Sequence, residues 1–144
     1  MNILVVDSSV IVKWLNQTRE ENLEQADKIL NQAMFGEVEL FAPELAKYEV
    51  GNVLITKGIT ASDVQTSLST LHSFPINFVP ESLDLARQTY SLAESLRITY
   101  YDASFLSVAK QYNSVLVTDN VKHQGRESRI KVIPLGDYPS KLDL

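Results

Sequence analysis

Carboxylate and amide side chains interrupt apolar stretches of this chain at four places. At each place, packing alone would favour another aliphatic residue. The residues are Asp7, Glu49, Asp102 and the pair Asp119-Asn120. A lone buried carboxylate is costly unless a positive or hydrogen-bonding group meets it. Several carboxylates that converge therefore indicate a divalent metal ion held by hard oxygen ligands.

Asp7 and Asp119 both come directly after predicted strands, where acidic residues also have ordinary local roles. An Asp after a strand commonly caps the next helix, but Ser8 and Ser9 are available for that role here. For Asp7 we therefore favour a functional role. Asp119 and Asn120 also fit a simple turn after a buried strand, so both interpretations stay open for this pair.

Glu49 and Asp102 lie on predicted helices. Glu49 shares a face with Leu45 and Val53, although a Glu at the edge of an apolar stripe can also reach water. Asp102 leads an apolar stripe that includes Phe105. It equally suits a first helical turn, where the helix dipole favours a negative charge. Neither residue is diagnostic alone, and the joint placement of the four sites carries the prediction.

Short aliphatic runs alternate with amphipathic segments, which is the pattern of a parallel sheet covered by helices. The expected strands span residues 2–7, 38–42, 76–79, 114–118 and 130–134. The expected helices follow residue 8 and cover about 20–35, 43–57 with Pro43 in the first turn, 60–73, 81–96 and 101–112. We therefore expect one domain over residues 1–144, an α/β fold that forms a three-layer α/β/α sandwich around a central parallel sheet of about five strands. Its core covers about residues 2–135, and a short tail from Gly136 onward follows.

Such open sheets bind ligands beyond the carboxyl ends of their strands, where the strand order reverses. Asp7 and Asp119 lie at such ends, which places them on the predicted functional rim. The chain has no cysteine, and its two histidines, His72 and His123, lack the paired spacing of a zinc site. A hard cation is therefore the better match to the acidic residues.

The composition is that of an ordinary soluble globular protein, with 44% hydrophobic and 22% charged residues. No apolar run approaches the ~20 residues that cross a bilayer, and Met1-Asn2-Ile3 does not begin a secretory leader. The absence of cysteine fits a reducing compartment, so we expect a cytoplasmic protein that does not bind membranes. The net charge of −5 argues against gripping nucleic acid with the whole surface, but allows a local basic patch.

Taken in order, these segments resemble the PIN domain family, especially the VapC-like toxins of bacterial and archaeal toxin–antitoxin pairs. The resemblance covers about residues 2–135. It rests on Leu4-Val5-Val6-Asp7-Ser8-Ser9, Pro43-Glu44-Leu45 with Tyr48-Glu49-Val50-Gly51-Asn52-Val53-Leu54, Tyr101-Asp102-Ala103-Ser104-Phe105-Leu106 and Leu116-Val117-Thr118-Asp119-Asn120. It implies a metal-dependent endoribonuclease with Mg²⁺ or Mn²⁺ as cofactor. Asp7, Glu49 and Asp102 would be its acidic residues, with Ser9 and Thr118 as polar support.

The fourth acidic site departs from the family pattern, which often has Thr, any residue, then Asp. Here Asn120 occupies the last of these positions, and Asp119 comes one residue earlier. Either Asp119 acts as the fourth catalytic and metal-binding acid after a small shift of the turn, or Asn120 binds through its neutral carbonyl. The second alternative lowers the negative charge and predicts one firmly held and one weakly held metal ion.

A basic segment, residues 122–131, follows this fourth site. It is either a solvated loop or a phosphate-binding segment, in which Lys122 and Arg126 would contact the substrate together with Asn120. Lys13 and Arg97 are lesser candidates for the same role.

The resemblance also implies an RNA substrate, a homodimer and a cognate antitoxin that covers the active-site groove. Amphipathic helices between residues 20 and 73 offer apolar surface for an antitoxin helix. Tyr100 and Tyr101, just before Asp102, are positioned either to pack or to stack on a base. Trp14, the single tryptophan, is expected in the core.

Other functional classes fit less well. A phosphoacceptor receiver domain would need an acidic pair after the first strand, where Asp7 is followed by two serines. Dinucleotide binding would need a glycine-rich turn at the same place. The open alternative is a PIN-like binding or scaffold module that has lost catalysis, which Asn120 motivates. Phosphatase or DNA-nuclease activity on the same site is a weaker option.

Overall fold

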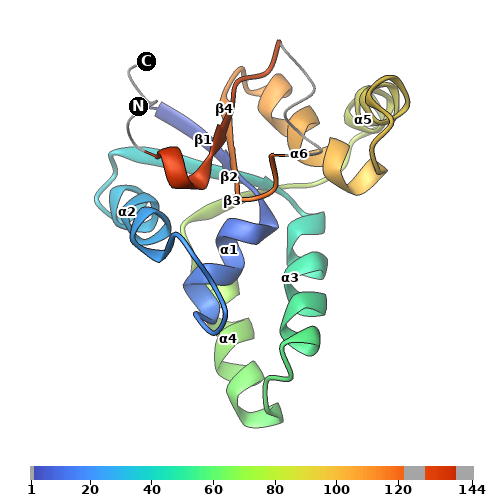
Figure 1. The fold of residues 1–144 in the computed structure, drawn as a ribbon. Coiled ribbons are helices and arrows are strands. Elements are labelled where there is room, and N and C mark those ends of the chain that lie inside the picture. Colours follow the sequence, from blue (N-terminus) through green and yellow to red (C-terminus); the bar gives the residue numbers. More distant parts are fainter. Residues whose placement is uncertain (1, 122–128, 139–144) are drawn as a thin grey trace.

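A parallel five-stranded sheet lies at the centre of the molecule (Figure 1), which is represented by a computed structural model that describes residues 2–121 and 129–138. Its strand order is β3-β2-β1-β4-β5. The strands are β1 (Asn2–Val6), β2 (Val38–Pro43), β3 (Ile76–Val79), β4 (Val115–Thr118) and β5 (Val132–Pro134). The expected strands are thus present, with small differences at their ends.

Helices cover both faces of this sheet (Figure 1). On one side lie α1 (Ser8–Leu15), α2 (Leu23–Met34), α3 (Leu45–Thr56) and α4 (Ala61–Ser73). On the other side α6 (Tyr100–Gln111) packs against β1, β2 and β4, and α5 (Leu83–Leu96) covers α6. A short 3₁₀ turn, η1 (Leu135–Asp137), follows β5. The expected α/β/α sandwich is confirmed.

The order of the strands reverses between β1 and β4. The chain builds β2 and β3 on one side of β1, and then places β4 and β5 on the other. In the register of this pair, Val5 lies beside Leu116 and Val6 beside Val117. Asp7, which follows β1, and Thr118, the last residue of β4, are therefore neighbours at the edge where open sheets bind ligands.

The interior of the sheet is aliphatic because helices exclude water from both of its faces. Leu4, Val5 and Val6 of β1 and Leu116 and Val117 of β4 have no exposed surface. This rigid, apolar pair of strands is what fixes the positions of the polar residues at their ends.

Three local features differ from the sequence expectation. Pro43 is the last residue of β2, paired in register with Val79, so α3 begins at Leu45 instead of at the proline. The packed part of the chain extends to Tyr138, which is 3% exposed, beyond the expected boundary near residue 135. Trp14 is only partly buried, and its Nε1 donates to the carbonyl of Ala26 at 2.7 Å.

In the described parts of the chain, no helix combines the length and apolar character needed to cross a bilayer.

Candidate active site

Asp7 connects β1, α1 and β4 at the rim of the sheet. Its Oδ1 caps α1 by accepting from the backbone N–H of Ser8 at 2.7 Å. Its Oδ2 accepts from Thr118 Oγ1 at 2.5 Å and from Ser9 Oγ at 3.3 Å. The backbone N–H of Asp7 extends the sheet pairing by donating to the carbonyl of Val117 at 3.1 Å. The ordinary capping role and the expected position on the rim therefore coexist in this residue.

Glu49 reaches the same place from the neighbouring helix α3. Its carboxylate is partly buried, and its Oε1 accepts from Ser8 Oγ at 2.8 Å. Ser8 thus donates its N–H to Asp7 and its hydroxyl to Glu49. Sequence reasoning treated Ser8 only as a possible cap, and nothing in the sequence signals its contact with a helix that lies more than thirty residues away.

Asp102 lies in the first turn of α6, where its backbone N–H donates to the capping hydroxyl of Thr99 at 3.0 Å.

Burial is the main cause that raises the pKa of Asp7 above its ordinary value. The hydrogen bonds from Thr118, Ser8 and Ser9 lower this pKa, and the charge of Asp102 raises it further.

The pKa of Glu49 is raised as well, first by burial and then, against the hydrogen bond from Ser8, by the charges of Asp7 and Asp102. The structure therefore brings Asp7, Glu49 and Asp102, which are far apart in sequence, into one region of negative charge.

The carboxylate of Asp119 binds partners outside this acidic region. Its Oδ2 lies 3.0 Å from Lys13 Nζ, and its Oδ1 accepts from Asn22 Nδ2 at 3.1 Å. Its backbone N–H donates to Ser9 Oγ at 3.1 Å. Asn120 is exposed, and its N–H donates to Thr118 Oγ1 at 2.9 Å. The fourth acidic residue therefore adjoins the site through its backbone, while both of its carboxylate oxygens have other partners.

The basic candidates are distributed differently from expectation. Lys13 is only 1% exposed, so it does not reach a phosphate from solvent, and that candidate role is wrong. Arg97 is exposed where α5 ends. Lys122 and Arg126 lie outside the described residues. The sequence did offer a signal for Lys13, which sits among the buried residues Val10, Ile11 and Val12 of a short helix.

The donor chemistry of this region fits a hard divalent cation. Within residues 2–121 and 129–138, no three Asp, Glu or His side chains are gathered closely enough to hold a metal ion as they stand. Instead, Asp7 Oδ2 accepts from the hydroxyls of Ser9 and Thr118, and Glu49 Oε1 accepts from the hydroxyl of Ser8. Neither carboxylate forms an ion pair with a Lys or Arg of the described residues. Because buried carboxylates need a positive partner, an added cation would supply what the described residues do not.

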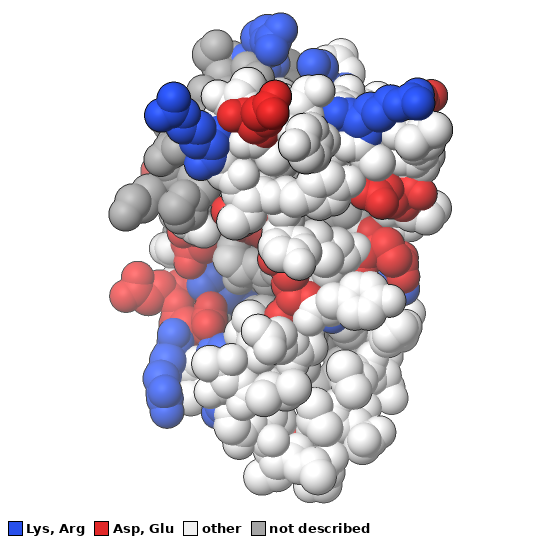
Figure 2. All heavy atoms as spheres, turned by 90° about the vertical axis from the view of Figure 1, so that its right-hand side faces the viewer, with Lys and Arg blue, Asp and Glu red and all other residues white. Residues whose placement is uncertain are grey.

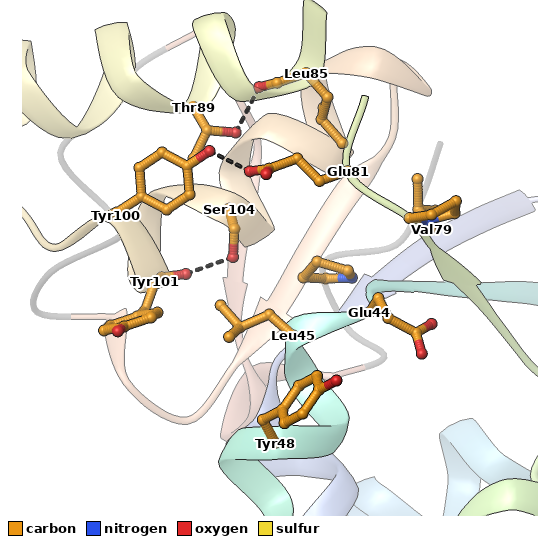
Figure 3. Close-up of a pocket in the computed structure, with 12 residues that line it drawn as sticks. Glu44, Leu45, Tyr48, Val79, Glu81, Leu85, Thr89, Tyr100, Tyr101 and Ser104 are labelled. Atoms are coloured by element: carbon orange, nitrogen blue, oxygen red, sulfur yellow. Dashed lines mark hydrogen bonds between the residues drawn. The ribbon is translucent and has the colours of Figure 1, made fainter. Parts of the chain in front are cut away.

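A pocket of about 360 Å³ lies between α3, α5 and α6. Tyr48 of α3 and Tyr101 of α6 stand at its opening with Leu45 between them, and each precedes one of the acids in sequence (Figure 3). Their side chains are largely exposed, at 74% and 57%. No described residue that lines it is a Lys or Arg.

The hydroxyls inside the pocket already have partners. Ser104 donates to the carbonyl of Tyr101 at 2.6 Å, and Thr89 donates to the carbonyl of Leu85 at 2.7 Å. The pocket therefore suits a flat, uncharged group better than a phosphate. On this side of the molecule, Asp and Glu side chains lie in a band across the middle, and Lys and Arg lie mostly toward the upper edge (Figure 2).

The sequence of this chain is similar to that of known proteins. The PIN domain profile matches residues 4–125. Ribonuclease VapC3 of Pyrobaculum aerophilum is 29% identical over 120 residues, which cover 80% of this chain and 87% of that protein.

Two solved structures share the fold. The first is VapBC2 from Rickettsia felis bound to a DNA fragment from their promoter. It superimposes with a TM-score of 0.71 at 17% identity and covers 92% of this chain and 98% of that one. The second is a toxin–antitoxin complex from Klebsiella pneumoniae, with a TM-score of 0.63 at 16% identity and coverage of 92% and 97%.

The raised pKa of Glu49 makes a prediction about the metal-free protein. Above its folded pKa, the charged carboxylate destabilises the folded state relative to the unfolded chain. We expect Glu49→Gln, which keeps an acceptor for Ser8, to increase the free energy of unfolding in urea at pH 7. The gain should disappear as the pH falls below the ordinary value of 4.5, because the wild-type carboxyl is then protonated in both states.

Glu94→Gln, at an exposed position of α5, is the matched control and should leave stability unchanged at every pH. A Glu49→Gln protein that is less stable than the wild type at pH 7 would contradict the electrostatic description of the site.

Proposed function

The chain belongs to the PIN domain family, and on that premise we propose that it is a metal-dependent endoribonuclease, the toxin of a toxin–antitoxin pair. The observation that carries the proposal is the electrostatic interaction of Glu49 and Asp102 with Asp7, which lies where the strand order reverses. The ribonuclease relative supports the reaction, and the toxin–antitoxin neighbour of the same fold supports the biological setting.

We propose that the carboxylates of Asp7, Glu49 and Asp102 hold Mg²⁺ or Mn²⁺. Such an ion supplies Lewis acidity, which activates water and offsets the charge of the phosphoryl group during hydrolysis. The chain's own part is to present the carboxylates. Thr118 and Ser9 hold Oδ2 of Asp7, and Ser8 holds Oε1 of Glu49. No side chain needs to become covalently attached to the RNA.

The pocket beside the acids supports single-stranded RNA as the substrate. Aromatic rings that flank a cleavage site bind unpaired bases by stacking, whatever the base. With a base between Tyr48 and Tyr101, the adjoining phosphate would lie toward Glu49 and Asp102, the next residues along each helix. Asn120, Lys122 and Arg126 stay proposed contacts to the RNA backbone, with Ser9 and Thr118 as support.

A second candidate function is a PIN-like binding module without catalysis, which the neutral Asn120 and the ion-paired Asp119 favour. Such a protein would bind RNA through the same pocket but leave it intact.

The uncharged surface of the molecule supports protein partners. Leu83 and Tyr90 of α5 are 66% and 62% exposed, and we propose that they contribute to a homodimer. The lower part of the face in Figure 2, at the far ends of α3 and α4, is almost free of charge. Ile55, near the end of α3, is 77% exposed. We propose that an apolar helix of the antitoxin binds there. A cytoplasmic location is part of the same proposal.

Cleavage should depend on both the metal and the acids. Purified protein, freed from any antitoxin, should cut structured RNA with Mg²⁺ or Mn²⁺ and stop when a chelator is added. Asp7→Ala and Asp102→Ala should each lower the rate by about a hundredfold or more, because each removes charge that holds the ion. Product bands on a denaturing gel measure the rate.

Cleavage that persists equally in both variants would reveal a contaminating nuclease and remove the support for an enzyme. Retained RNA binding without cleavage under every metal condition would instead favour the binding module.

The tyrosine pocket makes a separate prediction. Stacking on an aromatic ring is worth about 1–3 kcal/mol per base, so Tyr48→Leu and Tyr101→Leu should each raise the KM for single-stranded RNA by about 5- to 150-fold. Tyr48→Phe and Tyr101→Phe keep the ring and should retain the wild-type KM. If the Leu variants keep it as well, the pocket does not bind a base.

The partner proposal is tested by co-expression with the product of a short neighbouring reading frame. We expect the two proteins to purify together in an inactive complex, whose mass from light scattering corresponds to two copies of this chain with bound partner. Tyr90→Glu should yield a complex with a single copy. Phe35→Glu, at an exposed site at the end of α2, should keep the wild-type mass. A single copy in the wild-type complex would exclude the dimer.

A further inference from the structure

Lys13 is among the largest side chains that are fully buried in the described parts of the molecule. A buried ammonium group carries a desolvation cost of several kcal/mol unless anions meet it. Two do: Glu20 Oε1 lies 2.8 Å from Lys13 Nζ, and Asp119 Oδ2 lies 3.0 Å from it. The charge is therefore retained inside the protein by partners from two different segments.

These partners belong to a chain of alternating charges. Lys57, at the end of α3, lies 2.8 Å from Oε2 of Glu20, the residue whose other oxygen binds Lys13. Two cations and two anions thus follow one another, from Lys57 through Glu20 and Lys13 to Asp119. The series joins the end of α3, the connection after α1, α1 itself and the turn after β4. Its charges cancel, in contrast to the acidic region at the N-terminus of α1.

Helix α1 holds Asp119 at two points. Ser9 and Lys13 are four residues apart and therefore share one face of the helix. Ser9 Oγ accepts the backbone N–H of Asp119 at 3.1 Å, while Lys13 binds its carboxylate. Asn22 occupies the second carboxylate oxygen. With both oxygens bound, Asp119 is committed to this side of the helix.

The same contacts determine where Thr118 lies. Its hydroxyl donates to Asp7 Oδ2 at 2.5 Å and accepts the N–H of Asn120 at 2.9 Å. Because Asp119 is the residue between them, its anchoring to α1 fixes the turn from which Thr118 meets the catalytic carboxylate.

Stability alone does not account for a cation at this position. Replacing buried ion pairs with apolar residues of similar volume is often neutral or stabilising, and the neighbours of Lys13 on α1 are aliphatic. Placement of Asp119 is the property that an apolar residue would not supply.

We propose that Lys13 is a positioning residue of the active site, which keeps the Asp119 carboxylate out of the metal ligand set and fixes Thr118 against Asp7. The ligand set then has the three carboxylates of Asp7, Glu49 and Asp102, and Asp119 is a structural residue. This inference rests on the proposed metal site.

The test compares wild type, Lys13→Met, Asp119→Asn and the double variant. Two measurements are made without RNA: exchange of the Asp119 amide proton by NMR, and Mn²⁺ affinity by calorimetry. In Lys13→Met, exchange should accelerate about tenfold or more, since the turn is no longer held to α1. Mn²⁺ should bind about fivefold or more tightly, because the released carboxylate adds negative charge to the site.

The other two variants identify the cause. Asp119→Asn alone should keep the Mn²⁺ affinity within about twofold of wild type, and the double variant should lose the gain of Lys13→Met, because ligand charge sets affinity. A purely structural lysine would change stability but leave the Mn²⁺ affinity of Lys13→Met unchanged, which would overturn the proposal. A loss of about tenfold in Asp119→Asn would show that Asp119 is a ligand and would overturn it as well.

Two further outcomes stay informative. If Lys13→Met does not fold, the Mn²⁺ affinity of Asp119→Asn still decides whether Asp119 is a ligand. If the wild type binds no Mn²⁺, the proposed metal site is wrong, whereas unchanged amide exchange in Lys13→Met would separately show that Lys13 does not hold the turn.

Discussion

The repulsion between carboxylates that the fold forces together is the constraint on which the rest of the site depends. Asp7 follows β1, and Glu49 and Asp102 lie on α3 and α6. Burial raises the pKa of Asp7 and of Glu49, and the neighbouring carboxylate charges raise both pKa values further. The apolar pair of β1 and β4 places Asp7 and Thr118 at the rim, and Ser8 joins Asp7 to Glu49 of α3. Hydroxyl groups of Ser8 and Thr118 reduce the cost without cancelling the charge. This residual charge is what the proposed cation would offset.

Helix α1 contacts two groups of charged residues, one in which the acids bind hydroxyls and one in which they bind lysines. At its first turn the acids are met by neutral hydroxyls, so their charge is left available. At its other end Lys13 and Lys57 alternate with Glu20 and Asp119, so the charge is cancelled inside the protein. Both regions contain Asp and Glu. What differs is whether a lysine reaches the carboxylate, and this separates the acids proposed to act in chemistry from those bound in ion pairs.

The sequence predicts most of the fold, because strands that are buried on both faces must be aliphatic and the acids at their ends then stand out. It leaves the fourth acidic site open, because Asp119 and Asn120 both suit a turn and the partners of the Asp119 carboxylate, Lys13 and Asn22, come from a distant part of the chain. Lysine is normally an exposed residue, and its burial depends on Glu20 and on a turn distant in the chain. The sequence pattern predicts Pro43 in a helix, whereas it ends β2, because a proline suits the end of a strand as well as the start of a helix.

The pairing of β1 with β4 affects how the protein folds during its synthesis. The hydrogen bond between Thr118 and Asp7 spans 111 positions of the chain, and sheet contacts of such long range form late in folding. A ribosome adds about 5–20 residues per second, so several seconds separate the emergence of the first strand from that of its partner. During this interval the nascent chain has its first acid but not the strand that completes the rim. The complete rim therefore forms only after β4 has emerged and paired with β1.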